Sequence, residues 1–243
     1  MKMEIKKAAA SFWKIRRQQQ ERQRDSGRED AGLRGAVTGG AQMDAFAHLV
    51  CNAIIESGIQ NNCIYQKTAL QLPGYYRPEK KWDLLVIYKG ILGAAIELKS
   101  QVGPSFGNNF NNRTEEAIGS ATDLWTAFRE NRLGSIVRPF LGYVFLLEDC
   151  PRSNMPVDVV EPHFKVDPIF KGASYAQRYE IFCRRLVLER LYDASCFMTS
   201  TSDINNPEVH EPRSELSFKY FLDSLKGHMK SIQLLNFDNN SRL

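Results

Sequence analysis

Two apolar segments, at residues 82–87 and 91–99, are separated by only three residues. Each is rich in Leu, Ile, Val and Ala and has the length of a single strand. So short a connection joins neighbouring antiparallel strands, which predicts a β-hairpin. An isolated hairpin is marginal in water, so the rest of the chain must supply more strands and the helices that cover them.

The segments around this hairpin predict a mixed α/β unit. Apolar periodicity predicts a helix at residues 42–57, and β-forming residues predict a strand at 63–70. Asn112 and Glu115 form a capping-box pattern that starts a second helix, which continues to about Arg132. The almost wholly apolar run at 139–147 is typical of a strand covered on both faces. The order helix, strand, strand, strand, helix, strand predicts a sheet with a helix on each side.

This unit divides the 243 residues into three parts. Residues 1–41 form a basic N-terminal arm and a Gly-rich loop, residues 42–150 the core, and residues 151–243 a C-terminal helical region with helices at 174–192 and 214–229. We expect all three parts to pack as one compact domain. Residues 1–24 carry a net charge of +6, whereas the whole chain carries only +4. Such a basic arm suits phosphate contact, although a solvated helix is an equal alternative.

Composition excludes several classes of protein. No apolar run approaches the roughly 20 residues of a membrane helix, and no signal-peptide core is present, so we expect a cytoplasmic protein. The five cysteines are widely spaced, and the four histidines lack metal-ligand spacing. Neither Gly-rich nucleotide motif occurs, so ATP-driven translocation is not encoded in the chain.

Charged residues stand at the far end of the apolar hairpin. Side chains alternate along a strand, so Glu97 and Lys99 share one face. A three-residue loop at 88–90, with Gly90 as the left-handed residue, would bring Asp83 to the same face, opposite Ala95 and diagonal to Glu97. Diagonal neighbours lie about 7–8 Å apart, close enough for two carboxylates to hold one hard divalent cation.

Two carboxylates and a lysine in this arrangement suit phosphodiester hydrolysis. A bound metal ion would polarise the phosphoryl oxygen and supply hydroxide, and the ammonium of Lys99 would orient the water or offset charge in the transition state. A charged strand end is otherwise an ordinary solvated tip. The residue pattern therefore makes Asp83, Glu97 and Lys99 the candidate catalytic residues, with Asp83 and Glu97 as metal ligands.

These residues and the order of elements resemble the PD-(D/E)XK nuclease core, a restriction-endonuclease-like fold, here with extra N- and C-terminal helices. Gln101 adds the extended E-x-K-x-Q form of some members. Trp82 stands where many members have proline, a variable position.

The segment from Glu97 to Trp125 resembles more narrowly the central block of the XhoI-type restriction endonucleases, within a similarity that covers about residues 39–149. The resemblance implies a type II restriction enzyme of a restriction-modification system. It also implies a homodimer that needs Mg2+ and cuts both strands of double-stranded DNA at 5′-CTCGAG-3′ after the first C, leaving 5′ overhangs. A separate cognate methyltransferase is expected in the cell, not as a stable subunit. The alternatives are a repair or junction-resolving nuclease on the same core, and a catalytically inactive DNA-binding regulator.

Further candidates are weaker, because a solvated surface explains each of them as well. On the first core helix, Asp44, His48, Asn52 and Glu56 form a polar stripe, and we take Glu56 as a possible third metal ligand, since related nucleases use a glutamate from this helix. Four arginines at 178–190 are a possible lining of a DNA cleft. The remaining candidate DNA-binding residues lie in the loop after the second hairpin strand or in the arm: Gln101, Ser105, Asn108, Asn109, Asn111, Asn112 and Arg113, and Lys14, Arg16 and Arg17.

Overall fold

The computed structural model describes residues 1–25 and 40–235. It contains a six-stranded mixed sheet in the order β1-β4-β5-β6-β7-β8 and a separate two-stranded ribbon, β2-β3. The strands are β1 (Ile64–Tyr65), β2 (Gln71–Pro73), β3 (Glu79–Lys81), β4 (Leu84–Tyr88), β5 (Ile91–Gln101), β6 (Phe140–Glu148), β7 (Ala194–Ser200) and β8 (Val209–His210). The helices are α1 (Lys2–Asp25), α3 (Asp44–Glu56), α4 (Phe106–Arg129), α5 (Pro151–Asn154), α6 (Tyr175–Leu188) and α7 (Phe218–Gln233). None of the helices in these ranges is long and apolar enough to cross a membrane.

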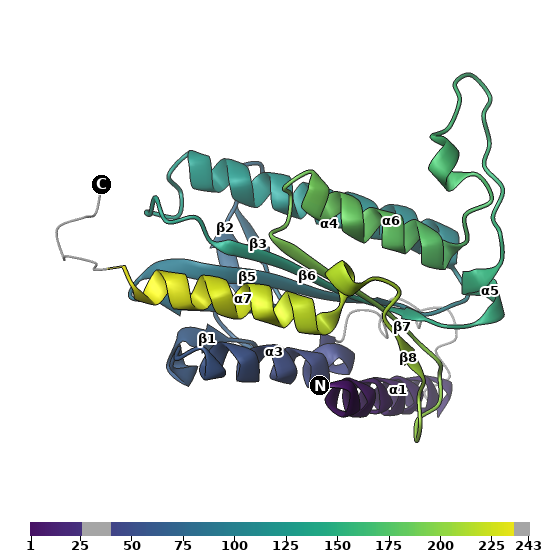
Figure 1. Cartoon of the computed structure of the whole chain (residues 1–243), viewed down its shortest axis with the longest axis horizontal. Helices are drawn as coiled ribbons and strands as arrows, with labels where there is room; N and C mark the ends of the chain where they lie inside the picture. The colour runs from purple at the N-terminus through teal and green to yellow at the C-terminus, as the bar shows by residue number, and fades with distance from the viewer. Residues whose placement is uncertain (26–39, 236–243) are drawn as a thin grey trace.

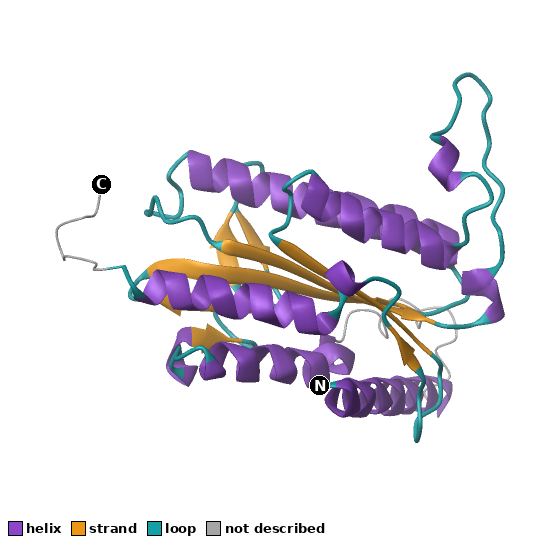
Figure 2. Ribbon diagram, viewed as in Figure 1, coloured by secondary structure: helices purple, strands orange, loops and turns teal. Residues whose placement is uncertain are grey.

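Helices cover both faces of the sheet (Figure 1, Figure 2). Strands β5, β6 and β7 run parallel, and α4 and α6 make the two connections between them. Such connections are right-handed, so two that step in the same direction place their helices on the same face. Helices α3 and α7 cover the other face, with α1 beside α3. This is the mixed α/β architecture that the order of elements predicted.

Strand β6 lies at the centre of both cores. Its Val144 and Leu146 pack with α3 and α7, whereas its Tyr143, Phe145 and Leu147 pack with α4 and α6. Both sets of side chains are buried, which is why the strand reads as a continuous apolar run.

The hairpin between β4 and β5 closes differently from the prediction. Tyr88 pairs with Ile91, and Lys89 and Gly90 both have positive φ, so the turn has two residues and the predicted three-residue loop is wrong. Turns of this type match the twist of the flanking strands. Gly93 then forms a bulge, because Val86 pairs with Ala94 while Ile87 pairs with Leu92.

The bulge shifts the register by one residue. Leu84 pairs with Ile96, so the register places Asp83 opposite Glu97, rather than diagonal to it across Ala95. Asp83 therefore shares a face with Glu97, as expected, but for a different reason. Gly93 is also a place of close approach, since a Cβ there would lie 2.9 Å from Ile232 of α7.

Helix α4 begins six residues earlier than predicted, at Phe106 instead of Asn112. Phe106 is buried and stacks on Tyr175 of α6 at 5.7 Å. This packing extends the helix through an Asn-rich segment whose low helix propensity predicted a loop. Tertiary contact therefore outweighed local preference here.

Helix α1 confirms the predicted helix but does not extend as an arm. Its apolar stripe, including Ile5, Ala8 and Phe12, is buried in the core with α3, and Trp13 Nε1 donates a hydrogen bond to Ser200 Oγ at 3.0 Å. The Gly-rich loop expected at 25–42 lies almost entirely outside the described residues.

The C-terminal part is not only helical. The predicted helices correspond to α6 and α7, but Ala194–Ser200 forms β7, which pairs with β6 along its whole length and is buried throughout. Similarly, the predicted strand at 63–70 is shortened to the two residues of β1. Small and polar residues at 194–200 gave a weak strand pattern, and the pairing partner of β7 lies about 50 residues earlier in the sequence.

Candidate active site

Asp83, Glu97 and Lys99 meet where β4 begins and β5 approaches its end. Lys99 Nζ lies 2.8 Å from Asp83 Oδ2 and also contacts Glu97 Oε2. The backbone N–H of Leu98 donates to the same Asp83 oxygen at 2.8 Å. The three candidate catalytic residues are therefore in direct contact, with the ammonium between the two carboxylates.

Lys80 is a fourth member of this cluster, which the sequence analysis did not identify. It lies on β3, and its Nζ contacts Glu97 Oε1 while it sits 4.4 Å above the ring of Trp82. The sequence feature that could have indicated its position is the turn-rich segment at 73–78, because this turn joins β2 to β3 and allows them to pair. That pairing carries Lys80 to the carboxylates from outside the main sheet.

The electrostatics follow from burial and from these contacts. Glu97 is only 2% exposed, and burial would raise the pKa of its carboxyl, but Lys99 and Lys80 outweigh this effect and lower the pKa. Burial and the charge of Glu97 raise the pKa of Asp83, against the opposing effect of Lys99. Burial would lower the pKa of Lys99, yet Glu97 and Asp83 raise it, so the ammonium stays protonated at neutral pH.

Two cavities open beside the cluster. One, of about 690 Å3, lies under α4 and is lined by Glu97, Lys80 and the buried Tyr143. The hydroxyl of Tyr143 has no hydrogen-bond partner among the described residues. The second, of about 610 Å3, is lined by Asp83 and by Asp44 of α3. A bound molecule can therefore approach the carboxylates from both sides.

The donor set fits a magnesium ion. Across residues 1–25 and 40–235, no three His, Cys, Asp or Glu side chains cluster in a way that would hold a metal alone. Mg2+ commonly takes only one or two carboxylates and completes its shell with water and substrate phosphate. Asp83 and Glu97 supply two hard oxygen ligands of this kind, whereas the cluster lacks the nitrogen and sulfur ligands typical of zinc.

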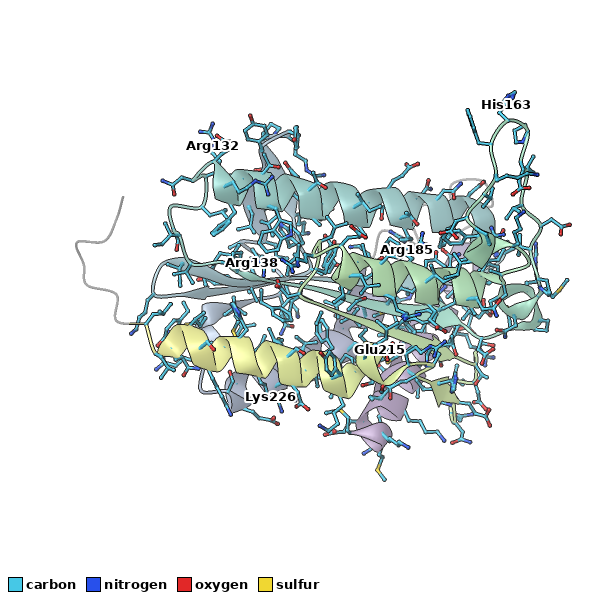
Figure 3. The ribbon with its side chains drawn as sticks, turned by 45° about the horizontal axis from the view of Figure 1, so that its top comes forward. Arg132, Arg138, His163, Arg185, Glu215 and Lys226 are labelled. Atoms are coloured by element: carbon cyan, nitrogen blue, oxygen red, sulfur yellow. The ribbon has the colours of Figure 1, made fainter. Side chains whose placement is uncertain are left out.

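Glu56 lies far from this cluster. It is the last residue of α3 and is exposed, with its carboxylate 3.8 Å from Lys226. Lys226 lies on α7, on the opposite side of the sheet from α4 (Figure 3). The other end of the same polar stripe, at Asp44 and His48, lines the cavity with Asp83. Asp44 and Glu56 are twelve residues apart, roughly 18 Å along a helix, so Glu56 as a metal ligand is not supported.

The residues expected in a DNA-reading loop lie mostly on a helix instead. Asn108, Asn109, Asn111, Asn112 and Arg113 occupy the first two turns of α4, and Ser105 precedes it. Of these, only Arg113 lines the cavities beside the carboxylates, with its Nε buried and unpartnered among the described residues. Gln101 is buried, and its amide donates to the carbonyl of Val102 at 2.9 Å, which turns it away from solvent.

The basic residues of α1 divide into two groups. Lys14 and Arg17 are exposed, so phosphate contact by these two stays a prediction. Arg16 is only 8% exposed, and its Nη1 donates to Gln42 at 3.4 Å. Gln42 donates in turn to Ser100, beside Lys99, so Arg16 is linked to the core, and phosphate contact by Arg16 also stays a prediction.

The arginines of α6 are held by protein groups. Arg185, labelled on α6 in Figure 3, contacts Asp167 at 2.5 Å. Arg178 donates to the carbonyl of Val157 at 2.9 Å. Both contacts fasten the long connection between α5 and α6. This arrangement favours the structural interpretation of the basic helix over a DNA cleft.

A mixed sheet covered by helices on both faces, with paired carboxylates and a lysine on two adjacent strands, defines a nuclease of the restriction-endonuclease-like fold. Comparison with known proteins narrows this class. The family model of the restriction endonuclease XhoI matches residues 22–210. The chain therefore belongs to the XhoI restriction endonuclease family, whose members are type II site-specific deoxyribonucleases.

Individual relatives agree with this assignment. The chain is 52% identical over 207 residues to the type II restriction enzyme BstVI of Geobacillus stearothermophilus, covering 83% of this chain and 92% of that enzyme. It is 50% identical over 182 residues to the type II restriction enzyme XhoI of Xanthomonas vasicola, covering 74% and 73% of the two chains. No solved structure matches the chain.

Proposed function

We propose that the protein cleaves both strands of double-stranded DNA at the palindrome 5′-CTCGAG-3′, after the first C, by Mg2+-dependent hydrolysis. The observation that carries the reaction is the direct contact among Asp83, Glu97 and Lys99. The choice of hexamer rests on the similarity to the enzyme named XhoI, which shares half of its aligned residues with this chain.

Each residue has a role that its environment supports. Asp83 and Glu97 would hold Mg2+, which when bound polarises a phosphoryl oxygen and makes water more acidic. Lys99 keeps its proton between the two carboxylates, so it acts as a hydrogen-bond donor and positive charge rather than as a general base. It therefore orients the attacking water or offsets the charge that develops on the phosphate.

The assembly follows from the symmetry of the site. A palindrome presents the same surface to each subunit of a two-fold dimer, and two active sites cut two strands in one encounter. We propose a cytoplasmic homodimer, with a separate cognate methyltransferase in the cell that protects the host DNA from cleavage and is not a stable subunit.

The two alternatives from the sequence have less support. A repair or junction-resolving nuclease is disfavoured by family membership along residues 22–210. An inactive regulator is disfavoured because both carboxylates and the lysine are present and in contact.

Digestion of a DNA of known sequence tests the proposal. With Mg2+ we expect fragments whose 5′ ends all map to the bond after the first C of CTCGAG, and no cleavage in chelator. Cuts at another fixed sequence would contradict the hexamer alone. Cuts at branched junctions, or none under any divalent cation, would contradict the proposed function.

A further inference from the structure

The turn between β2 and β3 is fastened to α4 by one carboxylate. Asp123, whose side chain is 5% exposed, accepts hydrogen bonds from the backbone N–H groups of Tyr75 at 2.7 Å and Tyr76 at 2.9 Å. Its other oxygen accepts a bond from Arg77 Nε at 2.7 Å. The turn is also tightly packed, because a Cβ at Gly74 would lie 2.7 Å from this carboxylate. A single side chain of α4 therefore fixes both the backbone of the turn and the guanidinium of Arg77.

This arrangement leaves part of Arg77 available. Among the described residues, its two terminal nitrogens donate no hydrogen bond, and the side chain is 43% exposed. A guanidinium is planar, so holding it at Nε sets the direction in which the terminal nitrogens point. The neighbouring rings of Tyr75 and Tyr76 are exposed and meet edge to face at 5.0 Å. The turn thus presents a rigid pair of donors beside exposed aromatic surface.

The position of the turn relates it to the carboxylate cluster. Arg77 and Tyr76 line the same cavity as Glu97, Lys99 and Lys80. Arg77 precedes Lys80 by three residues, so their α-carbons are at most roughly 10 Å apart. Lys80 in turn contacts Glu97. Because Arg77 and Glu97 line one cavity, a base pair near a phosphate cut at Glu97 would lie within reach of the terminal nitrogens of Arg77.

We propose that Arg77 recognises a guanine through its O6 and N7 atoms in the major groove, and that Asp123 is the positioning residue that aims it. The inference rests on the proposed function and adds to it a residue that determines specificity. Two donors in a fixed plane match the two acceptors of guanine, the commonest specific contact between protein and DNA. A phosphate contact would add affinity without sequence preference, and would not require so rigid a support.

Selectivity of binding tests this assignment. Arg77→Lys keeps the positive charge but loses the planar pair of donors. Each protein is incubated with duplexes randomised at six base pairs, with Ca2+ in place of Mg2+ to avoid cleavage, and the bound fraction is sequenced. We expect Arg77→Lys to lose about 5- to 150-fold of its discrimination at one G·C pair and at its symmetry-related pair, with the other positions unchanged.

Two further variants complete the design. Asp123→Asn should weaken selectivity at the same base pair, but by less than Arg77→Lys does. Thermal unfolding of Asp123→Asn is measured to check that this variant is folded. Arg213→Lys is the matched control, because Arg213 Nε also donates to a carboxylate, that of Glu180, at 2.6 Å. Arg213 lies outside the cavity that contains Glu97 and Lys99. It should select the same sequence as the unaltered protein.

The outcomes separate this inference from the function on which it rests. Unchanged selectivity in Arg77→Lys would overturn the role of Arg77 while leaving the endonuclease intact. An equal loss of affinity for all sequences, with no loss of selectivity at any base pair, would make Arg77 a phosphate contact and would also overturn it. An unaltered protein that selects no sequence would overturn the proposed function together with this inference.

Discussion

At the scale of single residues, the cluster balances two carboxylates against two lysines. Glu97 is buried between Lys80 and Lys99, and Asp83 contacts Lys99 at the more exposed side. Burial of an ion without a partner would cost several kcal/mol, so each charged group in the cluster offsets the desolvation cost of its neighbours. A divalent cation entering this cluster must compete with ammonium groups for the same oxygens.

Removal of a carboxylate and removal of a lysine from the cluster should both stop cleavage but should have opposite effects on DNA binding. Glu97→Ala should reduce cleavage by about 10²–10³-fold or more. In chelator it should bind DNA at least as tightly as before, because two lysines lose their carboxylate. Lys99→Ala should also stop cleavage but should weaken binding in chelator. Gel mobility shifts beside digests measure both effects, and a Glu97→Ala protein that cuts at a near-normal rate would place the active site elsewhere. Glu56→Ala is the control that should change neither.

Lys80 should tune the affinity for metal. Lys80→Gln removes a charge that pairs with Glu97 Oε1. Half-maximal cleavage should therefore need about 3- to 10-fold less Mg2+, which is the size of effect expected for a charge at contact distance in a partly screened site. Calorimetry with Mg2+ alone provides a reading that does not depend on cleavage. Lys81→Gln, at the exposed neighbouring position, should leave the Mg2+ requirement unchanged. A higher requirement in Lys80→Gln would mean that Lys80 assists catalysis rather than competing with the metal.

At the scale of elements, the site depends on how the β2-β3 ribbon, the β4-β5 hairpin and α4 meet. The ribbon supplies Lys80, the hairpin supplies the carboxylates, and residues of α4 line one side of the cavity between them. Asp123 joins α4 to the ribbon with three hydrogen bonds. The contact is therefore both a part of the fold and a support of the site.

This contact should depend on pH in a definite direction. Burial opposes ionisation of Asp123, but the hydrogen bonds from Tyr76, Arg77 and Tyr75 lower its pKa below the unfolded value of 3.8. Its contribution to stability is therefore present above about pH 4 and is lost as the pH falls through the lowered pKa. Asp123→Asn should lose about 1–2 kcal/mol of unfolding free energy at pH 7, since a charged acceptor is replaced by a neutral one.

Denaturant unfolding at several pH values measures the effect. The difference between Asp123→Asn and the unaltered protein should shrink toward pH 3. Asp223→Asn is a suitable comparison, because Asp223 makes exposed ion pairs with Lys219 and Lys226 on α7 and should have little effect on stability. A difference that stays constant with pH would show that the charge of Asp123 is not what fastens the turn.

At the scale of the whole molecule, residues 1–25 and 40–235 bring Asp83 and Glu97 together around Lys99 in one cluster. If both strands of a palindrome are cut in one encounter, two such clusters are needed, and a two-fold dimer would supply them. We expect sedimentation to show a particle of twice 27.7 kDa, at least when bound to the hexamer. Glu97→Ala should sediment like the unaltered protein, because the cluster is a local feature. A monomer both free and on DNA would contradict the dimer.

The sequence by itself determined the parts of this protein that depend on local pattern. Apolar periodicity predicted the helices and the central strands, and alternation along β5 placed Glu97 and Lys99 on one face. These predictions hold because side-chain direction in a strand depends only on the backbone repeat. The family resemblance rested equally on contiguous residues, from Glu97 to Trp125.

Only the tertiary structure decided features that depend on distant partners. The bulge at Gly93 set Asp83 opposite Glu97, packing of Phe106 on Tyr175 turned an expected loop into helix, and α3 presents Asp44 rather than Glu56 to the site. Lys80 entered the cluster because β2 pairs with β3, and β7 entered the sheet because β6 pairs with it. Each outcome is fixed by contacts between residues far apart in the chain, whose energies outweigh local propensities of a few tenths of a kcal/mol per residue.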